Sequence, residues 1–467
     1  MSGGLRHTAQ GWWIEEAGAP PACAPLSGPV EADVVVVGGG FLGMWTAWHL
    51  LQREPSCSVV LLESGRCGFG PSGRNGGFVN GYWEHVPSLA ERSGAAAAVA
   101  TALAADASIR AIGAFCEDHG VDAWYRPAPQ IEIATAASQD DGWLADMAAL
   151  QALGHGEEYV ELTREQVQEV CRSPLFRGAA AMRTAATVQP ARLAFGLRRV
   201  LLERGVRIFE DSVVRGIDAG GSSGVVARSD GGEVRARCAV LAVNSRTREW
   251  AAFRDELSVA SSHMVITEPV ADVLDEVGWT GGELLCDRRR MLHYFRTTPD
   301  GRIAFGWGGG RLAYGDGHQR RLDVDPAVVR LTIEALHRFF PALAGREVVH
   351  AWGGPIDVAP RRLPIYRSAG WVHAGWGFTG HGVGPTHLGG LILSGLALGV
   401  ADDATALPLV EPARKRFPPE PLRWAGGSLI RAALLRKDLR DERGARVDPL
   451  TVAITKLPKL LGMNLPR

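Results

Sequence analysis

The amino-acid sequence predicts an α+β fold in which a Rossmann-type domain, built from discontinuous segments, carries an inserted β-sheet domain. A β-branched run, Val34–Val37, leads into a glycine-rich turn and then into the helix-favouring segment Met44–Gln52. A block at 258–312 alternates apolar and polar residues and contains Pro299-Asp-Gly, which is typical of a hairpin turn. A second pattern of strand, glycine-rich loop and helix occurs at Val372–Gly390. We expect the two glycine-rich segments, although far apart in the sequence, to meet in one domain.

The first glycine-rich turn has the spacing of a dinucleotide-binding site. Gly38 would permit a tight turn after the strand, Gly40 would let the backbone approach a pyrophosphate, and Gly43 would let the helix pack closely. The N–H groups at the start of that helix would face the phosphates. A second strand, Ser58–Leu62, ends at Glu63, whose carboxylate would accept hydrogen bonds from a ribose and repel a 2′-phosphate. The pattern disfavours NADP and leaves FAD and NAD open.

Composition excludes several classes of protein. The 467 residues carry a formal net charge of −1, so no global field attracts nucleic acid or an anionic membrane. The seven cysteines contain no C-x-x-C pair, which argues against a disulfide framework or a metal site and fits a reducing compartment. The sequence holds no run of 18 apolar residues. We therefore expect a cytoplasmic protein with no bound metal, no nucleic-acid partner and no stable membrane insertion.

Lysine is confined to the end of the chain. All lysines lie in the last 53 residues, so none can serve a site formed only by the first 414 residues. The same region opens with proline-rich sequence and continues as an amphipathic segment, Leu422–Leu439, which we expect to dock on the chain's own domain. The lysines are Lys415, Lys437, Lys456 and Lys459.

The second glycine-rich segment decides the cofactor. A nicotinamide enzyme of Rossmann type needs one glycine fingerprint, whereas this chain would bring a second helix N-terminus to the same cofactor. A helix dipole in that place suits a flavin, because reduction puts negative charge near N1 and the C2 carbonyl. FAD is therefore the predicted cofactor. A nicotinamide-dependent dehydrogenase is the alternative.

Four motifs, together with Glu63, resemble those of the D-amino-acid oxidase/glycine oxidase superfamily of FAD oxidoreductases, and within it the branch that contains gamma-glutamylputrescine oxidoreductases. The resemblance implies a two-domain flavoenzyme that removes a hydride from the C–H bond beside an amine, so that the imine formed hydrolyses to a carbonyl compound. The motifs, in order from about residue 30 to 400, are ADVVVVGGGFLG with Glu63, GPSGRNGGF at 70–78, TVQPARL at 187–193 and GWGFTGHGVGPTHLGG at 375–390.

The resemblance also assigns cofactor contacts. It implies that the first glycine turn binds the pyrophosphate, Glu63 the adenosine ribose, the 70–78 loop the flavin, and the Gly-His-Gly segment the pyrimidine end of the isoalloxazine. The expected FAD contacts are Gly38, Gly40, Phe41, Leu42, Gly43, Glu63, Ser64, Ser72, Arg74, Asn75, Gly76, Val213, Val214, Asn244, Gly380, His381 and Gly382.

Positions at which this sequence differs from members of the superfamily limit the expected mode of flavin attachment and the expected substrate. Sarcosine-oxidase-like members tether the flavin through a cysteine where Gly354 stands, and dimethylglycine-oxidising members use a histidine where Arg74 stands, so FAD is expected to be noncovalent. The lysine that holds a carboxylate in sarcosine-type members corresponds to Gly384, which argues against a simple N-methyl amino acid substrate. A lysine that activates oxygen near the flavin is also missing, so the electron acceptor, O2 or another molecule, stays open.

Several side chains are candidates for chemistry. His381 lies in a loop expected to reach the flavin, and His293 and Tyr294 lie on one strand, so alternation should turn one of those two toward the cavity. Asp357 would sense an amine or cap a turn. Two clusters of consecutive arginines, Arg288–Arg290 and Arg361–Arg362, would either favour a substrate with a distant anion or form a solvated surface. An aromatic box for a cationic amine would use Trp307, Trp352, Trp376, Tyr82 and Trp83.

These observations define a domain plan and a function. We expect an FAD-binding domain formed by 32–85, 160–257 and 345–403, a substrate domain formed by 86–159 and 258–344, and a helical tail at 404–467. The predicted function is FAD-dependent oxidation of a primary or secondary amine of the gamma-glutamylputrescine or aminophosphonate type to an imine and then an aldehyde. The alternatives are oxidation of an N-substituted amino acid and a non-catalytic FAD-binding protein.

Overall fold

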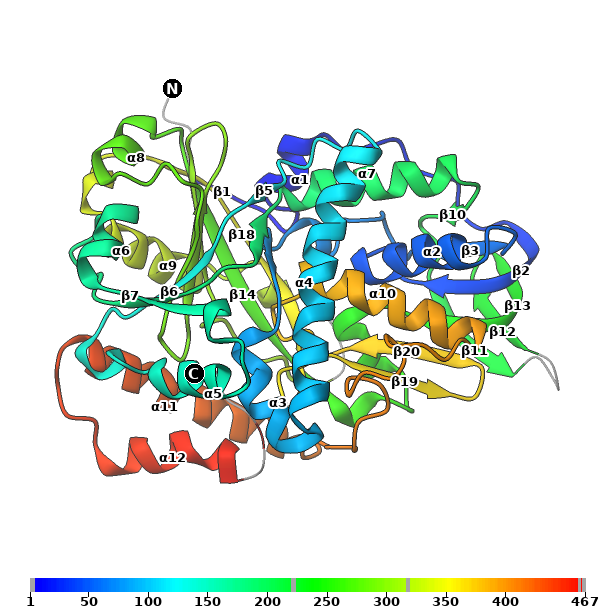
Figure 1. Cartoon of the computed structure of the whole chain (residues 1–467). Helices are drawn as coiled ribbons and strands as arrows, with labels where there is room; N and C mark the ends of the chain where they lie inside the picture. The colour runs from blue at the N-terminus through cyan, green and yellow to red at the C-terminus, as the bar shows by residue number, and fades with distance from the viewer. Residues whose placement is uncertain (1–4, 220–223, 316–319, 461–462, 464–467) are drawn as a thin grey trace.

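The computed structural model describes residues 5–219, 224–315, 320–460 and 463. The chain forms two bodies, each built on one large sheet, and they lie side by side with α4 (Ala95–Asp118) crossing in front of their junction (Figure 1). A small sheet of β4 (Phe78–Asn80), β9 (Ala185–Thr187) and β5 (Arg126–Pro127) adds a third set of pairings. The predicted α+β class is confirmed.

An eight-stranded sheet forms the nucleotide-binding body. Its strands are β2 (Gly28–Val37), β3 (Val59–Leu62), β10 (Arg207–Phe209), β11 (Val214–Ala219), β12 (Val225–Ser229), β13 (Gly232–Leu241), β19 (Ile365–Ala369) and β20 (Val372–Trp376). β2 pairs in parallel with β3 and β13, and β20 pairs in parallel with the end of β13. The carboxyl ends of β2, β13 and β20 therefore meet at one edge, where a doubly wound sheet binds its ligand.

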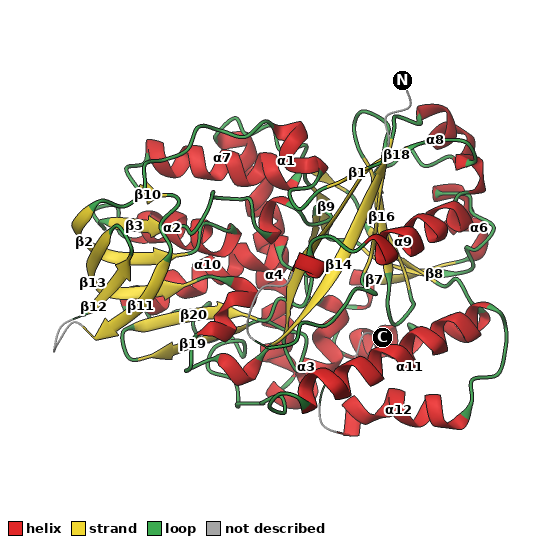
Figure 2. Ribbon diagram, turned by 180° about the vertical axis from the view of Figure 1, so that it is seen from behind, coloured by secondary structure: helices red, strands yellow, loops and turns green. Residues whose placement is uncertain are grey.

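A nine-stranded sheet forms the second body, in the order β1-β18-β14-β17-β16-β15-β6-β8-β7. The strands are β1 (Arg6–His7), β6 (Gln130–Ile133), β7 (Tyr159–Leu162), β8 (Ala179–Met182), β14 (Ser258–Thr267), β15 (Leu284–Asp287), β16 (His293–Thr297), β17 (Ile303–Trp307) and β18 (Val348–Val358). β16 and β17 form the hairpin predicted from Pro299-Asp-Gly. The long strands β14 and β18 run through the middle of the molecule (Figure 2).

The helices cover both sheets. They are α1 (Trp12–Ala17), α2 (Phe41–Arg53), α3 (Val86–Ser93), α4, α5 (Leu144–Ala152), α6 (Arg164–Val170), α7 (Pro190–Glu203), α8 (Ala271–Val277), α9 (Pro326–Phe339), α10 (Val383–Leu398), α11 (Leu422–Glu442) and α12 (Pro449–Leu460). α2 and α10, the helices that follow the two glycine-rich turns, pack against each other as expected. α4 is long and apolar enough to cross a membrane, but it packs on α3 and α10 as a helix of the folded body.

Sheet membership differs from the expected domain boundaries. The ranges 160–257 and 345–403 were expected to belong to the FAD-binding domain. They contain β8, β18 and all but the first residue of β7, yet these strands pair within the nine-stranded sheet. The reason is that residue alternation shows that a strand has one buried face but does not identify its partner. β10 ends at Phe209, where the chain turns through Asp211 at φ 49°.

The turn after β10 contains a buried carboxylate that joins distant segments. Glu210 is 1% exposed and accepts hydrogen bonds from Arg198 of α7, at 2.9 and 3.0 Å, and from Arg66, at 3.1 Å. It also accepts the backbone N–H groups of Cys23, at 2.7 Å, and Cys67, at 2.9 Å. Burial opposes ionisation, but these donors lower the pKa of Glu210 below its ordinary value. One carboxylate thus fixes the N-terminal arm, α7 and the loop after β3.

Replacement of Glu210 by Gln is expected to lower the free energy of unfolding by about 3 kcal/mol, because it leaves the buried Arg198 guanidinium without its counter-charge. Urea denaturation would measure the change. The matched control is Glu203→Gln on α7, whose exposed ion pair with Arg199 should contribute about 0.5 kcal/mol or less. Equal effects of the two substitutions would contradict the central role of Glu210.

Candidate active site

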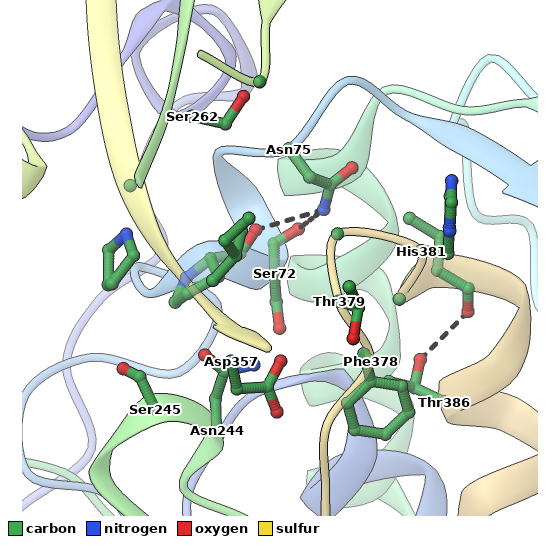
Figure 3. Close-up of a pocket in the computed structure, with 18 of the residues that line it drawn as sticks. Ser72, Asn75, Asn244, Ser245, Ser262, Asp357, Phe378, Thr379, His381 and Thr386 are labelled. Atoms are coloured by element: carbon green, nitrogen blue, oxygen red, sulfur yellow. Dashed lines mark hydrogen bonds between the residues drawn. The ribbon is translucent and has the colours of Figure 1, made fainter. Parts of the chain in front are cut away.

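One cavity of about 990 Å3 runs from the edge of the eight-stranded sheet to the nine-stranded sheet. Segments from all parts of the chain converge on it, and Figure 3 shows Ser72 and Asn75 opposite Asn244, Asp357 and Phe378 around the same space. Every expected FAD contact lines this cavity except Gly43, which lies behind the turn. The assignment of each residue to a part of the cofactor stays a prediction.

The first glycine turn is shaped so that side chains cannot be added. Gly38 has a φ of 110°, and a Cβ there would lie 2.4 Å from the carbonyl oxygen of Ala242. A Cβ on Gly43 would lie 2.0 Å from the Gly38 carbonyl oxygen. Because such distances are far below van der Waals contact, α2 reaches this position only with glycines in the turn. The start of α2 therefore opens directly onto the cavity.

Glu63 lies at the end of β3, where a ribose-binding carboxylate belongs. Its two oxygens accept the backbone N–H of Gly39, at 2.7 Å, and that of Gly65, at 2.9 Å, and Ser64 donates to it at 3.0 Å. The side chain is thus held at the mouth of the glycine turn. This geometry fits the adenosine half of a dinucleotide.

The 70–78 loop is fixed by its own side chains. Ser72 accepts the N–H of Phe41 at 2.8 Å, which joins the loop to the start of α2. Asn75 donates to the carbonyl oxygens of Pro71 and Ser72 at 3.1 and 2.8 Å (Figure 3) and accepts the Gly77 N–H at 2.7 Å. The loop therefore presents backbone and a hydroxyl to the cavity in one rigid shape.

Arg74 joins this loop to the other body. Its guanidinium forms an ion pair with Asp323 at 2.8 Å, and its carbonyl oxygen accepts the Trp352 indole N–H at 2.7 Å. Gly354, where related proteins carry a cysteine, lies close to the same guanidinium. The arginine thus holds the two bodies together on the wall expected to face the flavin.

His381 lies in the second glycine-rich loop and lines the cavity (Figure 3). Burial lowers the pKa of His381 to about 4 despite the opposing charge of Glu84. Its imidazole is therefore neutral near pH 7 and supplies no positive charge to the cavity. Its Nδ1 has no hydrogen-bond partner among the described residues, so it can receive or donate a hydrogen bond to a ligand.

Strand alternation turns Tyr294 toward the cavity and His293 away from it. The Tyr294 hydroxyl lies 2.7 Å from the Ser262 hydroxyl, and burial raises the pKa of this phenol to about 12. His293 is buried on the opposite face of β16, where its Nδ1 lies 2.7 Å from Asp287 and its ring stacks on Trp307. The catalytic role predicted for His293 is therefore corrected to a structural one.

Two glutamates that no motif indicated lie beside His381. Carboxylate and imidazole atoms of Glu84, His85 and His381 lie within 4.8 Å of one another, and Glu84 shares a hydrogen bond with Glu132. Burial and the charge of Glu84 raise the pKa of Glu132 to about 7, against the attraction of Arg288, whose guanidinium is 2.6 Å away. Although burial also opposes ionisation of Glu84, His85 holds the pKa of Glu84 well below its usual range. Each carboxyl group of this wall thus faces a basic side chain, Glu84 beside His85 and Glu132 beside Arg288.

Of the aromatic box, only Trp352 lines the cavity, while Trp307, Trp376, Tyr82 and Trp83 pack in the core. Asp357 lines the cavity and also accepts the Gly377 N–H at 2.6 Å, as the turn-capping alternative expected. Burial raises its pKa to about 7, and backbone N–H groups oppose this shift.

Comparison with known proteins agrees with this geometry. The model of the DAO family, described as FAD dependent oxidoreductase, matches residues 33–396. The chain belongs to this family. It is an FAD-dependent amine or amino acid oxidoreductase that acts on CH–NH or CH–NH2 groups. The cavity fits FAD, because its glycine turn, Glu63 and the 70–78 loop form a cradle that a Cβ at Gly38 would close.

Relatives cover most of the chain. A probable oxidoreductase OrdL of Rhizobium meliloti (strain 1021) is 27% identical over 91% of this chain and 94% of its own length. The gamma-glutamylputrescine oxidoreductase of Escherichia coli (strain K12) is 28% identical over 81% of this chain and 86% of its own length. Glycine oxidase from Geobacillus kaustophilus has a similar fold, with a TM-score of 0.67 and 20% identity over 83% of this DAO-family chain and all of its own.

The substitution Gly43→Ala is expected to abolish FAD binding, because the added methyl group would displace α2 from the glycine turn. The ratio of absorbance at the flavin band to that at the protein band of the purified protein measures cofactor content. Gly426→Ala on α11 is the control, since Gly426 lies outside the cavity and a Cβ there meets nothing within 4 Å. Retention of FAD by Gly43→Ala would contradict the assigned role of the turn.

Proposed function

We propose that this protein oxidises the C–N bond of an amine whose far end carries an anion, of the gamma-glutamylputrescine or aminophosphonate type, to an imine that hydrolyses to an aldehyde. The observation that carries the proposal is the carboxylate wall of Glu84 and Glu132 beside His381. A substrate ammonium group would be attracted to two buried carboxyl groups in a low-dielectric cavity. The similarity to a gamma-glutamylputrescine oxidoreductase supports the same substrate class.

In this proposal, different residues that line the cavity would bind the cofactor, orient the substrate and accept its proton. The glycine turn, Glu63 and the 70–78 loop would hold FAD, which when bound would supply the acceptor for a hydride from the carbon beside the nitrogen. Glu84 would orient the ammonium group, and Glu132, whose pKa is about 7, would accept the proton that must leave before the amine can donate a hydride. The neutral His381 would hold the substrate or the cofactor through a hydrogen bond. Tyr294 and Ser262 would close the opposite side of the cavity.

An α-amino acid substrate fits this wall less well. Its own carboxylate is bonded to the reacting carbon and would be brought toward Glu84 and Glu132, where like charges repel. We therefore favour an amine whose reacting carbon bears no carboxylate. We also propose a cytoplasmic location, since all seven cysteines are free thiols.

An anaerobic mixing experiment tests this function. The yellow holoenzyme is mixed with gamma-glutamylputrescine, 2-aminoethylphosphonate or sarcosine, and the flavin absorbance is followed before and after air is admitted. Bleaching by gamma-glutamylputrescine or the aminophosphonate, and not by sarcosine, is expected. The rate at which colour returns in air distinguishes O2 from another electron acceptor. Failure of both anion-bearing amines to bleach the flavin would overturn the proposed substrate class.

The affinity for the amine is expected to weaken about tenfold between pH 8 and pH 6, because protonation of Glu132 below its raised pKa removes one of the two carboxylate charges. Substitution of Glu132 by Gln should weaken binding at pH 8 and remove this part of the pH dependence. The concentration dependence of anaerobic flavin reduction gives the Kd. Glu161→Gln on β7, outside the cavity, should keep the full dependence. An unchanged pH profile in Glu132→Gln would exclude this role.

A further inference from the structure

The C-terminal helices, which the sequence predicted to dock on the chain's own domain, contribute side chains to the cavity. Figure 1 shows α11 and α12 together below the nine-stranded sheet, and side chains of both helices line the outer part of the cavity. They include three of the four lysines of the chain, Lys437, Lys456 and Lys459. The expectation that no lysine is available to the site was therefore wrong, because the tail brings three lysines to the cavity.

The tail is fixed to the loop that carries Arg288–Arg290. Asp438 of α11 accepts the backbone N–H groups of Arg290, at 3.1 Å, and Met291, at 3.0 Å. Glu442 forms ion pairs with Arg289 at 2.5 Å and Arg338 at 2.6 Å. Because Arg288 of the same loop pairs with Glu132, the loop leads directly from the carboxylate wall to the tail. The loop at 288–291 therefore connects Glu132, at the carboxylate wall, with the part of the cavity that the tail lines.

Charge compensation separates the lysines of α12 from the other cations. Arg288 pairs with Glu132, Arg289 with Glu442, and Lys437 with Asp441. Helix α12 itself contains no acidic residue. Among the residues that the structure describes, neither Lys456 nor Lys459 has an ion-pair partner. These two ammonium groups are thus available to a ligand in the cavity.

The orientation of α12 is consistent with such a role. Val452, Thr455 and Lys459, which are spaced three and four residues apart, line the cavity together with Lys456. Leu450 and Leu457 lie on another face of the helix and are 70% and 41% exposed. Both lysines are themselves exposed to solvent, so the helix presents them where the cavity opens to the surface.

We propose that α11 and α12 complete the substrate site and that Lys456 and Lys459 bind the anionic group, carboxylate or phosphonate, at the far end of the amine. This inference rests on the proposed function for the reacting end of the substrate. An elongated molecule with ammonium at Glu84 and Glu132 and an anion at α12 would meet opposite charges at the two ends of the cavity. A diamine such as putrescine has the same reacting end but a cation where the lysines lie.

The test compares gamma-glutamylputrescine with putrescine in the double variant Lys456→Ala/Lys459→Ala. The Kd for gamma-glutamylputrescine, measured from anaerobic flavin reduction, should rise about tenfold while the limiting rate is unchanged. The Kd for putrescine should stay the same or fall. The matched control, Lys415→Ala/Arg440→Ala, removes two positive charges from the tail outside the cavity and should change neither value. Equal effects of both double variants, or an unchanged Kd in the first, would overturn the inference.

A second measurement is independent of turnover. Gamma-glutamylethylamide carries the glutamyl α-carboxylate and α-ammonium groups but lacks the terminal amine of the putrescine part, and calorimetry gives its affinity for the holoenzyme. Binding by the wild type that is lost in Lys456→Ala/Lys459→Ala supports the anion site, even if no amine reduces the flavin and the proposed function fails. Absence of binding by the wild type, or equal binding by the variant, would refute it. Reduction of the flavin by 2-aminoethylphosphonate with a Kd that depends on the same lysines would instead identify a phosphonate as the anion.

Discussion

The buried Glu210 carboxylate is the interaction on which the cofactor side of this structure depends. It binds the N-terminal arm through Cys23, α7 through Arg198 and the loop after β3 through Cys67. That loop returns to the glycine turn, because the Gly68 N–H donates to the Gly39 carbonyl oxygen at 2.9 Å. A charge buried this deeply is stable only when all its donors are in place, so the segments around the expected FAD site are ordered together.

The fold and the cofactor side could be predicted from sequence because their causes are local. The turn around Gly38 and Gly43 requires glycine for steric reasons, and a carboxylate at the end of the next strand follows from the same βαβ unit. Alternation could show that one of His293 and Tyr294 faces the cavity but could not identify which, because that depends on the partner sheet. The pairing of β18 with β14 was not predicted either, because alternation does not identify the strand that lies beside a given strand.

The charged walls of the cavity could not be predicted, because they come from contacts between remote segments. Glu84 precedes α3, Glu132 lies on β6, and neither belongs to a motif. The arginines of 288–290 were expected either to favour a substrate with a distant anion or to form a solvated surface, whereas Arg288 and Arg289 form ion pairs with glutamates. The one available signal was the confinement of lysine to the tail, which has meaning only once α12 is known to reach the cavity.

The bonds that cross between the two bodies have a consequence for how substrate gains access. Arg74 pairs with Asp323, Arg296 donates to the Gly77 carbonyl oxygen at 3.2 Å, and Asp357 at the end of β18 binds the Gly377 N–H. A hinge motion that opened the cavity from this side would break all of these buried bonds at once. The helical hairpin at the C-terminus has few buried side chains and is held by ion pairs, by Asp438, which accepts two backbone N–H groups, and by Arg431, which donates to the carbonyl oxygens of Gly309 and Gly310. We therefore expect the rate of ligand exchange to be set by displacement of this hairpin, with the catalytic core remaining rigid throughout turnover.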